Sequence, residues 1–377
     1  MLSAAAYLPI HVLPVLVAVV VHEQRASLSQ AGWMATAYMA GQLLAAVGLP
    51  AVRARGVGRR WALLGSALLL SGLASSAHLT GMALVAGWFL IGSASGALYY
   101  LGTVLIARSR DPAFGFSLRL SVSLSVAGIC LLVAQALTGS GSYLDLIRGL
   151  CIALTVFLVL ALGLFGSEVQ ISGDSARTAA RSNSAIPLVI LYFLFTGQIG
   201  YWAFALHSSS HFEMSREQAL VAIAGCKVFG ALLMWPLSYR DRRQSISNGF
   251  LLPGLVLITG ILAAVSATQV FWFFCGLLLW EIGFNVLSAR LQTRAVRINP
   301  LQSGSWITAA IFLGAATGPA MQGHAAAHGF DGAFVGFAIG CALLPACWEQ
   351  FFQRPASPTD AAVRVARRLW SRQRVQR

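Results

Sequence analysis

The sequence predicts an all-α membrane protein of twelve transmembrane helices in two six-helix bundles, and three observations support this prediction. First, 57% of the 377 residues are hydrophobic and only 10% are charged, which is more apolar surface than a soluble domain can bury. Second, apolar segments of spanning length recur along the whole chain, without the alternating pattern of barrel strands. Third, arginines are concentrated in alternate connections between these segments.

The predicted spanning segments follow one another with short connections between them. In chain order they lie at residues 2–21, 31–52, 61–79, 82–106, 113–137, 146–166, 186–206, 218–237, 249–267, 269–289, 303–323 and 332–350. Each is long enough to cross the hydrocarbon layer of a bilayer as a helix. The first segment has no basic region before it, so we interpret it as a transmembrane helix and not as a cleaved signal peptide.

The longest connection is polar and falls midway along the chain. It divides the sequence into an N-terminal six-helix bundle at 1–166, a cytoplasmic linker at 167–185, a C-terminal six-helix bundle at 186–352 and a basic cytoplasmic tail at 353–377. Similar basic stretches, LPAVRARGVGRR and WPLSYRDRR, follow the second segment of each half. Parallel six-helix repeats of this kind are a common transporter architecture.

The placement of arginine predicts the orientation in the membrane. The connections after the second, fourth, eighth and tenth segments, the central linker and the tail are arginine-rich, whereas the opposite connections hold only Arg25, Arg148 and Arg216. The excess of positive charge on one side predicts that both termini are cytoplasmic, in what we expect to be a bacterial inner membrane. This topology accounts for the formal charge of +14, so we expect no nucleic-acid partner.

The basic tail has two possible forms. Val363, Ala366, Leu369 and Trp370 make an apolar stripe among arginines, which predicts an amphipathic helix on the anionic inner leaflet of the bilayer. A disordered basic tail that only enforces the topology remains an open alternative. The six cysteines fall inside or beside apolar segments without CxxC spacing, so we expect neither a disulfide framework nor a zinc site formed by them.

Two stretches of the sequence carry a resemblance to a known family. The first is GWFLIGSASGALYY in the fourth segment, and the second is the basic connection after the second segment. Together with the 6+6 arrangement, they make the chain similar to the major facilitator superfamily over essentially its whole length. The resemblance implies a secondary transporter that works by alternating access, whose first, second, fourth and fifth helices in each half line a central cavity.

The family also has a cytoplasmic gate motif, which the resemblance places on particular residues of this chain. The matching positions are Gly48, Arg53, Gly58, Arg59, Arg60 and, in the second-half copy, Asp241. The aspartate position of the first copy holds Val52 instead. The arginine that proton-coupled drug exporters carry in the fourth helix is replaced by Trp88, and the fifth segment lacks their Gly-Pro motif. These departures argue against multidrug export.

Few groups in the middle of the apolar segments can carry chemistry, and each is a candidate for substrate binding or coupling because charge is costly there. The candidates are Lys227, Glu281, Arg119, His11, Gln198, Trp202, Asn285 and Gln42. A structural interpretation stands beside each: Lys227 and Glu281 as a static ion pair, Arg119 as a side chain that reaches the interface, and the others as contacts between helices.

The functional hypothesis assigns roles to three of these groups. Arg119 and Lys227 attract a small organic solute, for which an anion is one option, and Glu281 carries a coupling proton. No nucleophile–base set and no nucleotide-binding motif is visible, so we expect a transporter and neither an enzyme nor an ATP-driven pump. We expect the transporter to be monomeric. We also expect no cofactor. A polytopic sensor or assembly factor without a transport cycle is an alternative, and it would tolerate loss of Lys227 and Glu281.

Two histidine pairs with a spacing of four residues lie near the ends of apolar segments. His207 and His211 occur in HSSSH, and His324 and His328 occur in HAAAH. Because this spacing puts two imidazoles on one helix face, the pairs could bind a transition metal, and transport of a metal ion or chelate is a second alternative. Histidine is also common where a helix meets water, so a site without metal is the simpler interpretation.

Overall fold

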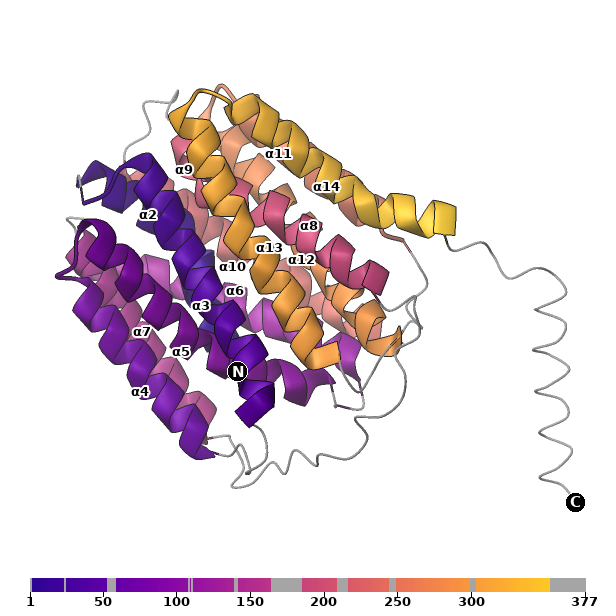
Figure 1. Cartoon of the computed structure of the whole chain (residues 1–377). Helices are drawn as coiled ribbons and strands as arrows, with labels where there is room; N and C mark the ends of the chain where they lie inside the picture. The colour runs from indigo at the N-terminus through magenta and orange to yellow at the C-terminus, as the bar shows by residue number, and fades with distance from the viewer. Residues whose placement is uncertain are drawn as a thin grey trace, which may run out of the picture.

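The computed structural model describes residues 2–23, 25–52, 59–107, 109, 111–138, 142–163, 185–208, 216–243, 249–298 and 303–352. This part of the chain is helical and contains no strand (Figure 1). The first half forms α1 (Leu2–His11), α2 (Leu13–His22), α3 (Leu28–Val52), α4 (Arg59–Ser76), α5 (Gly81–Ala107), α6 (Pro112–Thr138) and α7 (Tyr143–Gly163). The second half forms α8 (Ala185–Ala203), α9 (Ala205–Ser208), α10 (Arg216–Arg243), α11 (Leu251–Val265), α12 (Val270–Ile298), α13 (Ser303–Ala327) and α14 (Asp331–Phe352).

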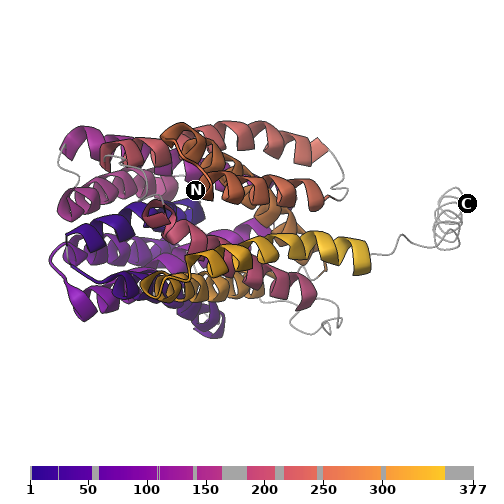
Figure 2. The ribbon, with the colours of Figure 1, turned by 90° about the horizontal axis from the view of Figure 1, so that it is seen from above.

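The axes of the long helices are roughly aligned, and the helices pack side by side, as the views from the front and from above both show (Figures 1 and 2). Six helices of the described part are long and apolar enough to cross a membrane: α5, α6, α7, α8, α12 and α14. The pair α1 and α2 adds a seventh span if the two are counted together. The protein is therefore an all-α integral membrane protein, while the full count of twelve spans and the division into two bundles of six stay predictions.

The first predicted span, at residues 2–21, is not one straight helix. It is broken between α1 and α2, which are bent by 40° relative to each other. Pro14 explains the break, because its ring has no N–H to donate to the carbonyl of Ile10 and crowds that group. The freed Ile10 oxygen accepts a hydrogen bond from Nε1 of Trp202 in the second half, at 3.0 Å. A break in one half is thus closed by a side chain from the other.

Small residues allow helices of the first half to pack with their backbones almost in contact. An added Cβ at Gly92 of α5 would lie 1.9 Å from the carbonyl oxygen of Tyr38 on α3, and one at Gly96 would lie 2.5 Å from Cα of Gln42. Glycine is therefore required at both positions for this approach of α3 and α5. Gly92 and Gly96 of the fourth predicted segment therefore form a small-residue face that is directed at α3.

The two halves approach each other closely along two seams that contain glycine. In the first seam, α3 lies beside α13 (Figure 1), and an added Cβ at Gly32 would lie 2.8 Å from the carbonyl oxygen of Pro319. In the second, an added Cβ at Gly128 of α6 would lie 2.7 Å from the side chain of Val228 on α10. The first seam lies toward the end where α3 begins and α13 ends, which is the end that the arginine pattern predicts to face outward, whereas the second lies near the middle of α6 and α10.

The close approach of α3 and α5 can be tested with two alanine substitutions. Gly92→Ala is expected to destabilise the protein by about 1–3 kcal/mol, because the new methyl group meets backbone that cannot move away easily. Gly336→Ala in α14 is the matched control, since nothing lies within 4 Å of the added Cβ. Thermal unfolding in detergent should show a lower melting temperature for Gly92→Ala only. Equal melting temperatures would contradict the packing.

Candidate functional site

A buried ion pair lies between α10 and α12. The ammonium group of Lys227 pairs with Oε2 of Glu281, and each residue is only 1% exposed. Asn285, one turn further along α12, donates from Nδ2 to Oε1 of Glu281 at 2.6 Å. Both oxygens of the carboxylate are therefore engaged. The structure brings together three of the residues that the sequence singled out, in an environment where either charge alone would be costly.

Aromatic rings cover the lysine side of this pair. The ammonium nitrogen of Lys227 lies 3.8 Å from the centre of the Trp202 ring and 5.9 Å from that of Trp280. The two indoles stack, with centroids 4.8 Å apart and planes inclined by 7°. A cation over a ring face is attracted to the electron density of the ring, so the indoles stabilise the ammonium group that burial disfavours. The contribution of Trp280 could not be read from the sequence.

The remaining polar atoms of this region are used in contacts between helices. Nε1 of Trp280 donates to Oε1 of Gln198 at 2.9 Å, and Nε2 of Gln198 donates to the carbonyl oxygen of Ala338 at 2.8 Å. Gln198 thus joins helices of the second half, and Trp202, also on α8, joins that half to the first through its hydrogen bond to Ile10. These bonds favour a positioning role for Gln198 and Trp202.

His11 and Gln42 also make hydrogen bonds within the bundle. Nε2 of His11 lies 2.8 Å from the hydroxyl of Ser123 on α6. Nε2 of Gln42 donates to the hydroxyls of Tyr38 and Ser95, at 3.1 and 2.8 Å. Oε1 of Gln42 is buried without a partner among the described residues. Both side chains thus join helices, as the structural interpretation of the sequence proposed.

Arg119 lies on α6 and reaches across to the second half. Its Nη2 donates to Oε1 of Gln292 on α12 at 2.8 Å, and its Nη1 donates to Thr103 on α5 at 3.1 Å. The guanidinium carbon lies 4.8 Å from the ring centre of Tyr99 and 5.2 Å from that of Phe116. Arg119 is 5% exposed, so its side chain is enclosed by helices of the two halves.

The partners of Arg119 were not found from the sequence, although one signal was present. Glu281, Asn285, Ser288 and Gln292 follow one another at intervals of four, three and four residues, which places them on one face of a helix. All four are 1% exposed. A buried polar stripe along α12 therefore connects the ion pair at one level with the Arg119 contact at another.

The expected cytoplasmic gate is described only in part. Gly48 lies in α3 with open space around it, and Arg60 in α4 is exposed. Arg53 and Gly58 fall outside the described residues, and the side chains of Arg59 and Asp241 are not described. The linker at 167–185, apart from Ala185, and the tail at 353–377 also lie outside the described part of the chain. The gate motif therefore stays a prediction.

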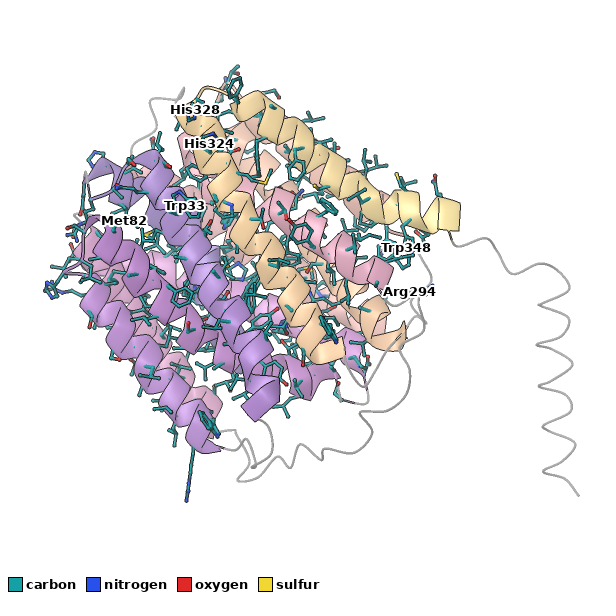
Figure 3. The ribbon with its side chains drawn as sticks, in the orientation of Figure 1. Trp33, Met82, Arg294, His324, His328 and Trp348 are labelled. Carbon is teal, nitrogen blue, oxygen red and sulfur yellow. The ribbon has the colours of Figure 1, made fainter. Side chains whose placement is uncertain are left out.

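The histidine pair of α13 gains no metal ligand from the described residues. His324 and His328 lie near one end of α13, with ring centres 4.2 Å apart (Figure 3). Nδ1 of His328 lies 2.9 Å from the carbonyl oxygen of His324, within its own helix. The described residues contain no group of three side chains able to hold a metal ion. The side chain of His207 and all of His211 lie outside what the structure describes.

The ion pair can be tested through stability. Lys227→Met leaves the buried Glu281 carboxylate without a compensating cation, and Glu281→Gln leaves Lys227 without a compensating anion, so each is expected to cost about 3–5 kcal/mol. The double variant contains neither charge and should regain most of the loss in melting temperature. Arg148→Gln, which breaks a pair whose arginine side chain is 65% exposed, is the control and should change little. Additive losses in the double variant would argue against direct pairing.

The interpretation of the histidines can be tested with metal. Adding zinc to the purified protein is expected to leave its melting temperature unchanged, because two imidazoles alone make a poor zinc site. The double variant His324→Ala/His328→Ala provides the comparison. A rise in the wild-type protein that the double variant lacks would establish a metal site at this end of α13.

Comparisons with known proteins place the fold. No protein-family model matches the sequence, and no curated protein is significantly similar to it. A mutant of the nucleoside transporter NupG superposes with a TM-score of 0.70 at 13% identity, over 92% of this chain and 97% of that one. A mutant of the E. coli fucose:proton symporter FucP superposes with a TM-score of 0.60 at 13% identity, over 94% and 98%. The described helices thus have the fold of the major facilitator superfamily, which the sequence resemblance implied.

Proposed function

We propose that the protein is a secondary active transporter that moves a small organic solute across the membrane by alternating access. The observation that carries this proposal is the position of the buried charges. Arg119 of the first half contacts α12 of the second, and Lys227 and Glu281 lie on the two second-half helices that pack against α6. Charge buried where two halves of a membrane protein meet is expected at a transport site.

The contacts between the halves suit a rocking motion. Besides the two glycine seams, they include single hydrogen bonds from Arg119 to Gln292, from Trp202 to Ile10 and from Thr36 to the carbonyl oxygen of Ala316. Each such bond contributes on the order of 1 kcal/mol net, so the interface can open at one end without a prohibitive cost. We propose that the described arrangement, with the seam of Gly32 and Pro319 toward the predicted outer end, is closed on that side.

We propose further that Glu281 couples transport to protons. A proton on Glu281 removes the charge that compensates Lys227, so protonation of Glu281 and its pairing with Lys227 exclude each other. The ammonium group would then depend on the rings of Trp202 and Trp280 and would favour a different arrangement of α10 and α12. Proton binding would in this way bias the equilibrium between the two open states, and no covalent chemistry or bound cofactor is needed.

The topology and the partners belong to the same proposal. Both termini and the central linker lie in the cytoplasm, the gate motif closes that side in the opposite state, and the basic tail contacts anionic lipid. The protein acts as a monomer. The histidine alternative is not favoured by any described contact, and a sensor without a transport cycle would have no need of a buried ion pair that is costly to form.

The proposal is tested by reconstitution. Solutes that raise the melting temperature of the detergent-purified protein are selected from organic anions, sugars and nucleosides, and their uptake into proteoliposomes is measured with and without a proton gradient. Uptake that exceeds equilibrium only with the gradient, and that a protonophore abolishes, is expected. Absence of uptake for every stabilising solute would overturn the proposal.

Glu281→Gln separates coupling from solute passage. The variant is expected to lose gradient-driven accumulation while it keeps exchange of labelled for unlabelled solute, because exchange needs no net proton movement. Asp331→Asn is the matched control, since that carboxylate lies at the start of α14 and accepts a hydrogen bond from Gln322. Undiminished accumulation by Glu281→Gln would remove Glu281 from the coupling mechanism.

A further inference from the structure

Arg119 is a buried cation that no carboxylate of the described residues neutralises. The ion pairs in the described part of the chain join Arg25 to Glu23, Arg148 to Asp145 and Lys227 to Glu281. The sequence explains why Arg119 has no carboxylate beside it among the described residues. Of the twelve acidic residues, Glu281 alone occupies the middle of a predicted span, and the others fall in connections, in the tail or near helix ends.

The contacts that Arg119 does make are neutral. Its guanidinium donates to an amide oxygen and a hydroxyl oxygen and lies against two aromatic rings. Hydrogen bonds and ring contacts reduce the cost of burying a cation, but they do not cancel its charge. Since Lys227 and Glu281 cancel each other, the fully buried charged side chains of the described residues carry a net charge of one, located on Arg119.

We propose that Arg119 is the docking group for the transported solute and that the solute is an organic monocarboxylate. This inference rests on the proposed transport function and narrows it to one class of solute. One carboxylate brings the buried centre to neutrality, whereas a dianion would reverse its charge and a phosphate monoester, which is close to doubly charged at neutral pH, would do the same. The planar fork of the guanidinium also matches the two oxygens of a carboxylate.

Lys227 is not needed for this recognition. The sequence-based hypothesis assigned the attraction of an anion to Arg119 and Lys227 together, but the carboxylate of Glu281 already compensates the lysine. A second anion at Lys227 would have to displace Glu281 and would lose the hydrogen bond that Asn285 donates to it. The two cations therefore have separate tasks, anion docking for Arg119 and coupling for Lys227 with Glu281.

The surroundings of Arg119 indicate the shape of the rest of the solute. The ring of Tyr99 lies 5.4 Å from that of Tyr7 on α1 and 4.8 Å from that of Phe312 on α13. Phe116 contributes a further ring beside the guanidinium. Helices from both halves thus surround the charge with aromatic surface, which suits a carboxylate attached to an apolar or aromatic body.

Docking at Arg119 would also alter the contact between the halves. Nη2 of Arg119 now donates to Oε1 of Gln292, whose own Nε2 donates to the hydroxyl of Ser288. A carboxylate that accepts both parallel N–H groups takes the place of Gln292, and the hydrogen bond between α6 and α12 is lost. Solute binding then breaks one hydrogen bond between the halves, which couples recognition of the solute to the movement of one half against the other.

The test is a melting experiment on the full-length protein in detergent with matched probes. The probes are the straight-chain monocarboxylates from acetate to octanoate, benzoate and phenylacetate, each compared with its primary amide, and phthalate as a dianion. At least one monocarboxylate is expected to raise the melting temperature by about 2 °C or more, while its amide and phthalate do not. No response to any monocarboxylate, or an equal response to the amide, would overturn the proposal.

Variants of Arg119 supply a second measurement. Arg119→Gln should abolish the stabilisation by the carboxylate and leave the melting temperature of the unliganded protein equal or higher, because it removes an uncompensated buried charge. Arg119→Lys keeps the charge without the fork and should retain only part of the response. Arg148→Gln is the matched control and should respond as the wild type does. A strong loss of stability in Arg119→Gln, with the response to benzoate intact in Arg119→Lys, would assign Arg119 a structural role.

The outcomes separate this inference from the transport function on which it rests. Uptake of another class of solute into proteoliposomes, without any carboxylate response, would keep the transporter and reject the monocarboxylate. Binding of a carboxylate through Arg119 without uptake would keep the monocarboxylate site and reject the transport function.

Discussion

The burial of side chains in the middle of the bundle is the constraint on which the rest of the structure depends. In that setting a charge must be paired, covered by polarisable surface or compensated by a ligand. Lys227 and Glu281 satisfy this requirement by pairing, with Asn285 completing the carboxylate and two stacked indoles covering the ammonium group. Arg119 satisfies it only in part, and the proposed recognition of an anion follows from that difference.

The same constraint applies to the backbone. Pro14 leaves the carbonyl of Ile10 without its helical partner, and an unpaired carbonyl buried in an apolar interior costs on the order of 1–3 kcal/mol. Trp202 supplies the missing donor from the opposite half. Its indole therefore serves two purposes at once, since one edge closes the break in the first span and one face covers Lys227. The break and the ion pair are connected through a single side chain.

The polar stripe of α12 places these features in order along one helix. Glu281 and Asn285 belong to the ion pair, while Ser288 and Gln292 lead to Arg119, all on one buried face. A carboxylate bound to Arg119 and a proton bound to Glu281 would therefore act on the same rigid element from two levels. Both would change how α12 lies against its neighbours, α6 for the solute and α10 for the proton, and this shared element is the physical basis for coupling in the proposed cycle.

Composition and periodicity determined the class of this protein, because a chain so apolar and so rich in spanning segments has no stable form outside a bilayer. They also placed Lys227, Glu281, Asn285 and Arg119 among the candidates, since charge within an apolar segment is recognisable without coordinates. Which charges meet was decided only by the tertiary structure. Lys227 and Glu281 are 54 residues apart and Arg119 and Gln292 are 173 apart, and helical periodicity relates only residues within one helix. The break at Pro14 had a local cause that the sequence contains, but its partner Trp202 lies 192 residues from Ile10 and was set by the packing of the two halves.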